Sequence, residues 1–430
     1  MENIFDLAIV GAGPAGLMAA KTAAELGLKV TLIEMKHDIN IIKRACSAQF
    51  VMDEGYENES LKLQDNKVFF PKNGFHITYT GDLLNITDNY HYSPSGNRIH
   101  LAHPDHTPFA IKFDKGQLLQ DLLDDCEKHG VELRLETIAS GGEDMGDHVR
   151  LDFKKHENST SINARKLVIA EGANAKVTGI FGFNEGRTLF GIPLVLSYTI
   201  DDTTGFEPHS WNQFYGSAYH PFAEIMVESS LEGNNAIELT ITGTKDFPPD
   251  KLFDNLVKNS PMSKHFTNAR IIDQKGCSLK SYSPIKKPYS GNVLVIGDSA
   301  AHVEVLVQGA IMCGYHAANA VKDELTGKNG FEQYTCWWNE SFEFNSADPL
   351  ELVKLYSSLA MKPKCSDNEL DYMFALLEGE VLNGDFSQFE VPKKVWKAIL
   401  AHKDQIQTER AILFDKIKHI DELNRVGKLN

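Results

Sequence analysis

The chain opens with an apolar run, a glycine-rich turn and a second apolar run. Residues Phe5–Val10 are mostly apolar and end at a glycine, which predicts a strand. A helix is expected from about residue 14 to 26, with Gly27 beyond its end as a C-cap. A second strand is expected over about 29–34. This order predicts the βαβ opening of a Rossmann-like α/β domain.

The pattern then becomes less regular. Residues 44–108 are rich in polar turn residues, and we expect this segment to be irregular. A helix is predicted over 114–129, because its leucines recur at helical spacing. The leucines on its shared face are Leu118, Leu119, Leu122 and Leu123. Short strands should follow and end in the apolar run 167–170.

A second change of pattern falls between residues 186 and 243. Strand-like stretches at 193–200, 223–229 and 236–242 are separated by turn residues, which predicts an antiparallel sheet. A strand at 293–296 should return to the first sheet, with a helix beginning near Gly309. Residues 331–430 have a helical pattern with charged faces.

Composition and charge narrow the possible classes. The 430 residues are 42% hydrophobic and 24% charged, which is ordinary globular composition and enough for two or three structural units. The formal net charge of −16 disfavours binding to nucleic acid or to an anionic membrane by bulk attraction. We therefore expect no nucleic-acid partner and at most peripheral membrane contact.

The cysteines and the N-terminus indicate a reducing compartment. The six cysteines form no CxxC pair and no zinc-finger spacing, so we expect free thiols and no metal site. The N-terminus lacks the basic region of a cleavable signal. No apolar run approaches the roughly 18 residues of a membrane span. We expect a cytoplasmic protein.

The first motif is the glycine-rich turn after the first predicted strand. It reads Gly11-Ala12-Gly13-Pro14-Ala15-Gly16. The three glycines suit a tight turn, a close approach of backbone to a pyrophosphate, and close packing of helix on strand. The helix start presents free N–H groups to the phosphates. Glu34 ends the second strand, where a carboxylate can accept hydrogen bonds from a ribose diol. Dinucleotide binding follows, but this motif alone does not separate FAD from NAD.

A distant second motif favours FAD. The strand near 293–296 ends in Gly297-Asp298, where a carboxylate can bond a polyol and a helix start can face a phosphate or a flavin edge. Since NAD has no ribityl chain, two distant motifs on one long cofactor favour FAD. The alternative is that Asp298 only caps a helix.

Together with Glu171-Gly172 after the strand at 167–170, these motifs resemble the class A flavoprotein monooxygenase superfamily, and within it most nearly the geranylgeranyl reductase family. That family usually has Asp-Gly where this chain has Glu171-Gly172. Lys115 stands where the family has a helix-start arginine that reaches the cofactor. The resemblance implies FAD as cofactor and adds contacts beyond the motifs. The added cofactor contacts are Met35, Lys36, Arg44, Ala45, Lys115, Ile138, Gln308, Gly309 and Ala310.

The resemblance also suggests the domain organisation. We expect a discontinuous FAD-binding domain over 1–75, 110–185 and 275–330, a substrate domain over 76–109 and 186–274, and a helical C-terminal region over 331–430. Two departures stand out. The family's proline before a glycine pair is missing in Val305-Leu306-Val307-Gln308-Gly309-Ala310, and its aromatic substrate signature has only a distant counterpart in Ser217-Ala218-Tyr219-His220-Pro221-Phe222.

Two residues are candidates for the chemistry. Cys46 follows the second strand at a place that resembles a cysteine near the flavin in the reductase family, and Lys43 and Arg44 beside it favour the thiolate. Its alternative role is that of a small buried hydrophobe. His302, after the Gly-Asp turn, is a candidate acid or a structural cap. The second domain also has three aromatic residues that are either a wall of the substrate site or core residues: Trp211, Phe214 and Tyr215.

The predicted function is hydride transfer from reduced FAD to a C=C bond of a small prenyl or enoyl-like substrate. The alternative is an FAD-dependent monooxygenase that hydroxylates an aromatic substrate, and a non-catalytic flavin-binding protein is a third possibility. There is no second dinucleotide motif, so NADH or NADPH would dock transiently or an electron-donor protein would supply electrons. The helix-like segment with Lys393, Lys394 and Lys397 fits either a membrane surface or a solvated face.

Overall fold

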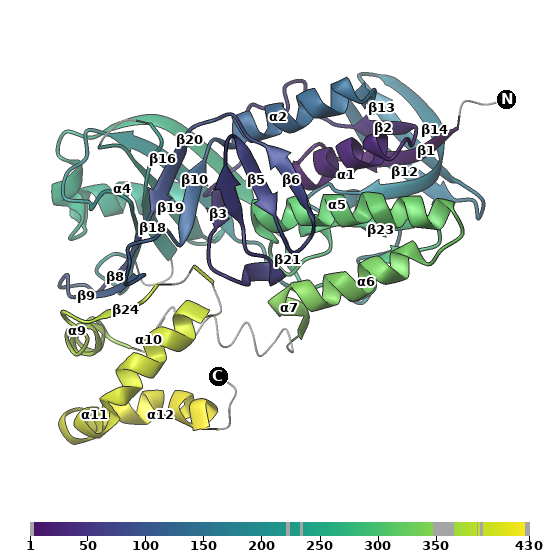
Figure 1. The fold of residues 1–430 in the computed structure, drawn as a ribbon. Helices are drawn as coiled ribbons and strands as arrows, with labels where there is room; N and C mark the ends of the chain where they lie inside the picture. Colours follow the sequence, from purple (N-terminus) through teal and green to yellow (C-terminus); the bar gives the residue numbers. More distant parts are fainter. Residues whose placement is uncertain are drawn as a thin grey trace.

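The computed structural model describes residues 4–220, 224–232, 235–346, 365–384, 386–387 and 390–425. Pro221 and Phe222, and residue 223 of one predicted strand, lie outside the described residues. The described chain forms two large sheets side by side, with a group of C-terminal helices beneath the second one (Figure 1). The predicted fold class, a Rossmann-like domain with an antiparallel sheet and a helical C-terminal region, is confirmed.

The first sheet contains the predicted βαβ opening. Within the described residues its strand order is β11-β2-β1-β14-β13-β12, and β23 and β22 continue the sheet beyond β14. β11, β2, β1, β14 and β23 run parallel, whereas β12 and β13 form an antiparallel extension of β14. The strands are β1 (Phe5–Val10), β2 (Val30–Ile33), β11 (Glu132–Arg134), β12 (Thr137–Asp144), β13 (Val149–Lys155), β14 (Asn158–Ile169), β22 (Tyr289–Ser290) and β23 (Val293–Val295).

Two helices from distant parts of the chain lie side by side on this sheet. They are α1 (Pro14–Glu25) and α5 (Leu306–Leu325), as Figure 1 shows. A Cβ on Gly314 of α5 would come within 2.3 Å of the Ala15 carbonyl oxygen of α1, so only glycine permits this approach. α6 (Gly330–Ser341) packs beside α5, and α2 (Lys115–Lys128) packs beside α1 with Asp114 as its N-cap.

The segment 44–108 is not irregular, as the sequence had suggested, but holds several short strands. Two small sheets, β3-β10-β7 and β4-β5-β6, and two strands of the second large sheet, β8 and β9, account for it. Their strands are β3 (Gln49–Val51), β4 (Lys62–Gln64), β5 (Lys67–Phe70), β6 (Phe75–Thr78), β7 (Leu83–Ile86), β8 (Asp88–Tyr92), β9 (Arg98–Ala102) and β10 (Ala110–Phe113). Strands of three to five residues are too short for their alternation to emerge from the turn residues around them.

The second large sheet has two different faces. Its order is β20-β16-β19-β18-β17-β8-β9-β24, antiparallel except at the β17–β8 and β9–β24 pairs. One face carries apolar side chains such as Ile225, Val227 and Leu239, which pack with Leu252 and Leu256 of α4 (Pro249–Asn259). Besides β8 and β9, its strands are β16 (Leu194–Asp201), β17 (Ser210–Phe214), β18 (Glu224–Ser229), β19 (Ile237–Gly243), β20 (Arg270–Ser278) and β24 (Val381–Asn383).

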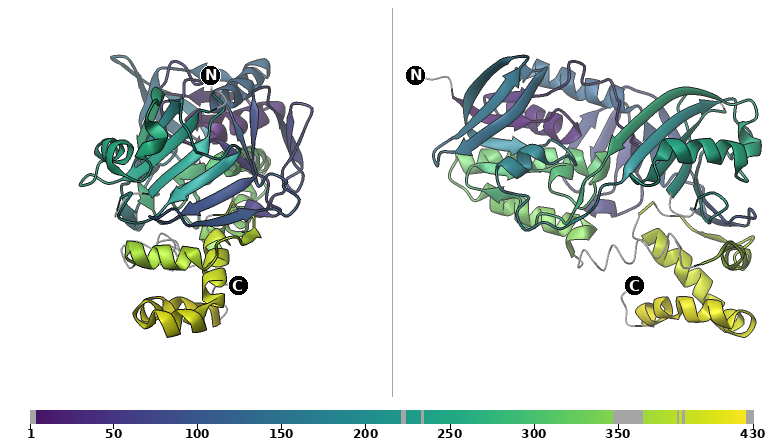
Figure 2. Two further views of the ribbon diagram at one scale, coloured as in Figure 1. Left: turned by 90° about the vertical axis from the view of Figure 1, so that its left-hand side faces the viewer. Right: turned by 180° about the vertical axis from the view of Figure 1, so that it is seen from behind.

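The C-terminal helices form their own small core. They lie apart from the first sheet, beneath β8 and β9 (Figure 2). Leu370, Phe374, Trp396 and Ile399 pack there with Leu101 of β9. This region is not wholly helical, because β24 (Val381–Asn383) joins the second sheet. The helices of this core are α9 (Asp367–Ala375), α10 (Glu390–Ala401), α11 (Lys403–Glu409) and α12 (Ala411–Arg425), whereas α7 (Glu343–Ser346) packs with α6 beside the first sheet. Among the helices described here, none is long and apolar enough to cross a bilayer.

Candidate functional site

The glycine-rich turn lies between β1 and α1, with each glycine in a different environment. Gly11 has φ +99°, and a Cβ there would come within 2.5 Å of the Ala170 carbonyl oxygen. A Cβ on Gly16 would overlap the Gly11 carbonyl oxygen, at 1.8 Å. A Cβ on Gly13 would meet nothing within 4 Å. Gly11 and Gly16 are therefore required by the fold, whereas Gly13 opens backbone to a ligand, as a pyrophosphate needs.

Glu34 reaches back to this turn. Its buried carboxylate accepts hydrogen bonds from the Ala12 N–H at 2.7 Å and from the Lys36 N–H at 2.9 Å. Each carboxylate oxygen retains one further lone pair, so the group can still accept from a ribose hydroxyl. Glu34 therefore fixes the shape of the turn as well as offering the predicted ribose contact.

Two exposed apolar side chains flank Glu34. Met35 is 68% exposed and Ile138 is 48% exposed. They are neighbours because the Thr137 N–H donates to the Glu34 carbonyl oxygen at 2.9 Å. Exposed apolar side chains beside a carboxylate that is predicted to bind a ribose fit the faces of an adenine ring. This placement supports the predicted roles of Met35, Lys36 and Ile138, which remain predictions.

The second motif meets the first at the carboxyl ends of β1 and β23, which flank β14 in the sheet. Gly297 has φ +64°, and its missing Cβ would lie 3.3 Å from the Cβ of Ala15. The Ser299 hydroxyl donates to the Gly172 carbonyl oxygen at 3.1 Å, which adds the third motif. The fold thus gathers the turn at 11–16, Gly172 and Gly297-Asp298 at one edge of the first sheet, where doubly wound folds bind ligands.

Asp298 caps the turn that leads into α5 and also faces a cation. Its Oδ1 accepts from the Val305 N–H at 3.0 Å, and its Oδ2 lies 3.7 Å from an Nη of Arg44. The capping role that the sequence left open is therefore present. Arg44 also covers Gly172, since a Cβ there would be 3.2 Å from its Nη1. The half-buried Asp298 and Arg44 stand at the junction of the three motifs.

Further titratable groups surround Arg44. Burial opposes its charge, but Asp298, Cys277 and Glu304 outweigh burial and raise the guanidinium pKa. Burial and the charge of Asp298 raise the pKa of Glu304. The positive charges of Arg44 and Lys115 partly offset this increase. Burial raises the pKa of the Cys277 thiol, which is hydrogen-bonded to Arg44. Lys115, at the first turn of α2, therefore adds positive charge to this cluster, and its contact with the cofactor remains a prediction.

Cys46 borders the same cluster from the loop before β3. It is half-buried and interacts electrostatically with Arg44 and with Cys277. Ala45 lies between Arg44 and Cys46 and is also half-buried. The Lys43 carbonyl oxygen accepts from the Gly276 N–H at 3.1 Å, which ties this loop to β20 of the second sheet. Cys46 is thus placed where the two large sheets meet.

Two predicted residues turn away from the shared edge. The Glu171 carboxylate accepts from the Thr178 N–H at 2.6 Å and from its hydroxyl at 2.9 Å, so it caps α3 (Lys176–Ile180). His302 Nδ1–H donates to the Tyr282 carbonyl oxygen, 3.0 Å away, and its ring lies edge-on to Phe190. Burial lowers the pKa of His302. These contacts suit structural roles, and the acid role of His302 remains a prediction.

The start of α5 is packed by the protein itself. The Gln308 Oε1 accepts from the Val51 N–H of β3 at 3.1 Å. A Cβ on Gly309 would come within 2.7 Å of Glu57 and 2.8 Å of Phe342. The Cα of Gly309 therefore faces those two side chains, and Ala310 beside it is buried. Contact of these three residues with a flavin ring remains a prediction.

Arg187 is a site residue that sequence reasoning missed. Its guanidinium donates to the carbonyl oxygens of Ser283 at 2.7 Å, Ser299 at 3.0 Å and Ala301 at 2.9 Å. It thereby clamps the turn that carries Asp298. Burial lowers its pKa to about 10. Nothing in the local pattern around Arg187 indicates this role, because its partners lie about a hundred positions away along the chain.

The predicted aromatic wall is divided among three clusters. Trp211 stacks on Phe386 with ring centroids 4.7 Å apart, beside Leu306 at the start of α5. Phe214 belongs to the core under α4, whereas Tyr215 packs with the C-terminal helices. Of these three, only Trp211 shares a cluster with Leu306 at the start of α5.

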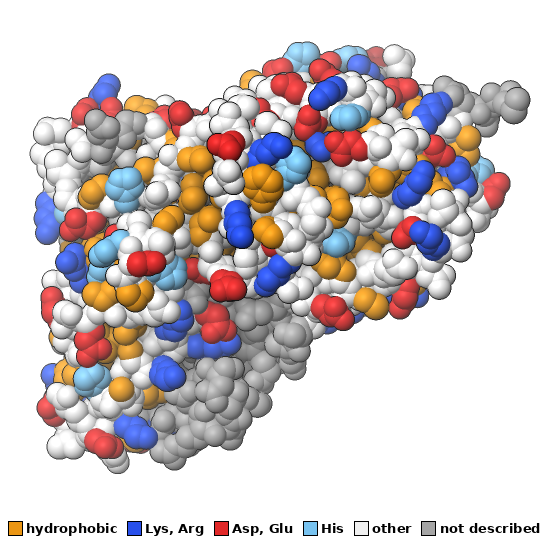
Figure 3. Space-filling view, viewed as in Figure 1, with side chains coloured by type: hydrophobic (Ala, Val, Ile, Leu, Met, Phe, Trp, Pro, Cys, Tyr) orange, Lys and Arg blue, Asp and Glu red, His pale blue; other side chains and the backbone are white. Residues whose placement is uncertain are grey.

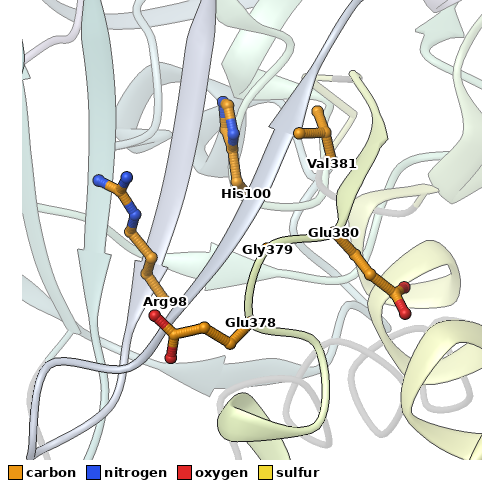
Figure 4. A pocket seen from close by; sticks show the side chains of 6 residues that line it. All are labelled: Arg98, His100, Glu378, Gly379, Glu380 and Val381. Carbon is orange, nitrogen blue, oxygen red and sulfur yellow. The ribbon is translucent and has the colours of Figure 1, made fainter.

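A separate cavity of roughly 320 Å³ lies between β9 and the loop before β24 (Figure 4). The Arg98 guanidinium points away from the Glu378 carboxylate in this view. The lining residues are Arg98, His100, Glu378, Gly379, Glu380 and Val381. None of them was predicted to bind the cofactor, and none contacts the motifs above.

The family model for pyridine nucleotide-disulphide oxidoreductases matches residues 5–195. The chain is 22% identical over 421 residues to digeranylgeranylglycerophospholipid reductase 2 of Methanopyrus kandleri, covering 94% of this chain and 97% of that protein. It is 26% identical over 337 residues to the digeranylgeranylglycerophospholipid reductase of Methanosarcina mazei, covering 77% and 76%.

Solved structures share the fold. A geranylgeranyl bacteriochlorophyll reductase-like protein of Thermoplasma acidophilum superposes with a TM-score of 0.71 at 18% identity, covering 96% of this chain and 100% of that one. A flavin-dependent brominase gives a TM-score of 0.61 at 16% identity, covering 98% and 100%. With the glycine turn, Glu34 and Gly297-Asp298 gathered at one sheet edge, the chain is an FAD-dependent oxidoreductase that is similar along most of its length to digeranylgeranylglycerophospholipid reductases.

Proposed function

We propose that this chain reduces C=C bonds of a prenyl-type substrate with reduced FAD. The observation that carries the proposal is the meeting of three separated motifs beside a half-buried thiol, in a chain whose curated relatives are named as reductases of digeranylgeranyl lipids. When bound, FAD supplies the hydride for such a reduction.

The residues at the sheet edge would bind and orient the cofactor. Gly13 and the first N–H groups of α1 would hold the pyrophosphate, because backbone is open there and the helix start carries partial positive charge. Glu34 would hold the adenosine ribose, and Asp298 the polyol chain. Arg44 and Lys115 would balance negative charge on the cofactor. Arg187 would keep the Asp298 turn in place through its three carbonyl contacts.

Cys46 would act on the substrate side. Reduction of a C=C bond adds one hydride and one proton, so the site needs a group that can deliver a proton to the second carbon. The Cys46 thiol is half-buried next to Arg44 and lies where the two sheets meet. Cys46→Ala should therefore lose turnover, whereas Cys336→Ala, at an exposed cysteine of α6, should not.

The electron source and the membrane contact are further parts of the proposal. NADH or NADPH would dock transiently, or a donor protein would reduce the cofactor. A long prenyl substrate would be taken from a membrane surface through peripheral contact of the C-terminal helices. Two lysines of α10 are already paired, Lys393 with Glu390 at 2.6 Å and Lys394 with the Gly384 carbonyl at 3.1 Å. Acidic and basic side chains are interspersed over the face in Figure 3, so a contact there would be weak.

The test is anaerobic reduction of a defined prenyl lipid. The FAD-loaded protein is reduced chemically without O₂ and mixed with a digeranylgeranyl phospholipid in detergent micelles. The expected result is a mass gain of two hydrogen atoms for each bond reduced. If the lipid stays unchanged and the protein instead hydroxylates an aromatic compound only when O₂ is present, the monooxygenase alternative replaces this proposal.

A further inference from the structure

A buried ion cluster lies between β10 and the second sheet. The Lys112 side chain is almost wholly buried, and its Nζ lies 3.2 Å from Glu228 Oε1 and 3.0 Å from Glu238 Oε2. Glu228 of β18 is 3% exposed and faces Glu238 of β19 directly across the ladder. A second oxygen of Glu228 accepts from the Gln49 side-chain amide. Unpaired charges at such depth would cost several kcal/mol, and here Lys112 pairs with both carboxylates.

The cluster holds the loop that carries Cys46. Lys112 Nζ donates to the Ser47 carbonyl oxygen at 3.0 Å, and the Ser47 side chain is hydrogen-bonded to Glu228. The next residue along the loop, Ala48, has φ +50°, a left-handed conformation that a non-glycine residue rarely adopts. The Ala48 carbonyl oxygen accepts from the Phe113 N–H at 2.9 Å. The strained turn directly after Cys46 is therefore held from β10, and Lys112 supplies its charged contact.

The charge of the cluster is not balanced at every pH. One lysine faces two carboxylates, so a proton on one carboxyl group leaves the cluster neutral. Burial, opposed by Lys112, raises the pKa of Glu228 to about 7. The groups that face Glu228 are Lys112 from β10, Glu238 from β19, and Gln49 and Ser47 from β3 and the loop before it. The side-chain oxygen of Gln49, Oε1, is buried without a hydrogen-bond partner. Rotation of the amide group would let it accept a hydrogen bond from a protonated Glu228.

We propose that Lys112 and Glu228 are positioning residues that hold Cys46 in its working geometry by anchoring Ser47. The inference rests on the proposed role of Cys46, but its consequence can be measured without a substrate. When Glu228 loses its proton, the extra negative charge changes the hydrogen bonds that Lys112 and Glu228 make to Ser47. The accessibility of Cys46 should follow that change.

The experiment measures alkylation of Cys46 by iodoacetamide in the FAD-loaded full-length protein. Peptide mass spectrometry gives the Cys46 rate relative to that of exposed Cys336 in the same sample, from pH 5.5 to 9. We expect Lys112→Met to raise this ratio by about tenfold, because a charged hydrogen bond to the loop is lost. Lys112→Arg, which keeps the charge, should restore most of the native ratio.

The matched control is Lys166→Met. Lys166 is also largely buried, donates to Asn292 at 2.9 Å and pairs with Glu324 at 3.5 Å, but it lies on β14. Lys166→Met should leave the ratio of the Cys46 and Cys336 alkylation rates unchanged. An equal effect of Lys166→Met and Lys112→Met, or no effect of Lys112→Met, would overturn the proposal.

Glu228→Gln provides a second test of the proposal if the Lys112 variants fail to fold. The native Cys46 ratio should change with an inflection near neutral pH, and Glu228→Gln should remove that inflection. An inflection that persists in Glu228→Gln contradicts the proposal. The alkylation assay uses no substrate, so it tests the anchoring role separately from the proposed function. If the variants alter the Cys46 ratio but the protein reduces no lipid in the separate assay, the proposed function is rejected and the anchoring role is retained.

Discussion

Gly297 lies against Ala15, so the start of the second motif is packed on the first. A Cβ on Gly297 would stand 3.3 Å from the Ala15 Cβ, and φ at Gly297 is +64°. The contact exists because β14 pairs with β1 on one side and with β23 on the other, which brings their carboxyl ends to one edge. A molecule bound at the Gly13 turn can therefore extend to Asp298, as an FAD-sized cofactor requires.

Gly13 and Gly16 should respond differently to substitution. Gly13→Val should leave the unfolding temperature of the cofactor-free protein within a few degrees of native and weaken FAD binding at least about tenfold, since the side chain enters the open space at the turn. Gly16→Ala should destabilise the protein by about 3 kcal/mol or more, because its Cβ overlaps the Gly11 carbonyl oxygen. Thermal unfolding and flavin fluorescence titration measure the two effects. Equal loss of stability in both variants would contradict this division.

Glu34→Gln should weaken both the turn and the cofactor. Glutamine keeps one acceptor oxygen for two backbone N–H donors, those of Ala12 and Lys36, and turns an NH₂ group toward one of them. We expect a loss of about 1–3 kcal/mol in unfolding free energy and weaker FAD binding. Urea unfolding and calorimetric titration with FAD test this. Glu136→Gln, at an exposed neighbour, is the control and should change neither quantity.

Arg187→Met should loosen the Asp298 turn. The substitution leaves the carbonyl oxygens of Ser283, Ser299 and Ala301 without their charged donor. The expected cost is about 3 kcal/mol in unfolding free energy, with weaker FAD binding. Arg165→Met removes an exposed arginine that pairs with Asp6 and should cost far less. Equal unfolding free energies and equal FAD affinities in the two variants would show that the Arg187 contacts to the Asp298 turn have no role.

Glu228 should make stability fall as pH rises through neutrality. The pKa of Glu228 is 4.5 when unfolded and about 7 when folded, since burial penalises the carboxylate. The folded state therefore binds more protons between these values, and the stability present below pH 4.5 is lost as pH rises toward 7, by on the order of 3 kcal/mol. Glu228→Gln should flatten this part of the profile in urea unfolding from pH 5 to 8. Glu378→Gln, at an exposed glutamate, should keep the native profile.

The sequence alone was sufficient for the elements whose signals are local. The helix predicted over 14–26 is α1 (Pro14–Glu25), and Gly27 follows it with φ +78°. The helix predicted over 114–129 is α2 (Lys115–Lys128). Periodicity, caps and glycine turns act over a few residues, so they can be identified without knowledge of the fold. The same signals failed over 44–108, where the strands are too short to show a period.

The sequence by itself also predicted dinucleotide binding, because Gly11, Gly13, Gly16 and Glu34 lie close together along one βαβ unit. Tertiary structure alone decided which side chains support that site. Arg187 reaches the Asp298 turn, and Lys112 joins Glu228 beside Ser47, through sheet registers between segments far apart in the chain. Such contacts depend on how strands pair and pack, and no local pattern of hydrophobic and polar residues encodes that pairing.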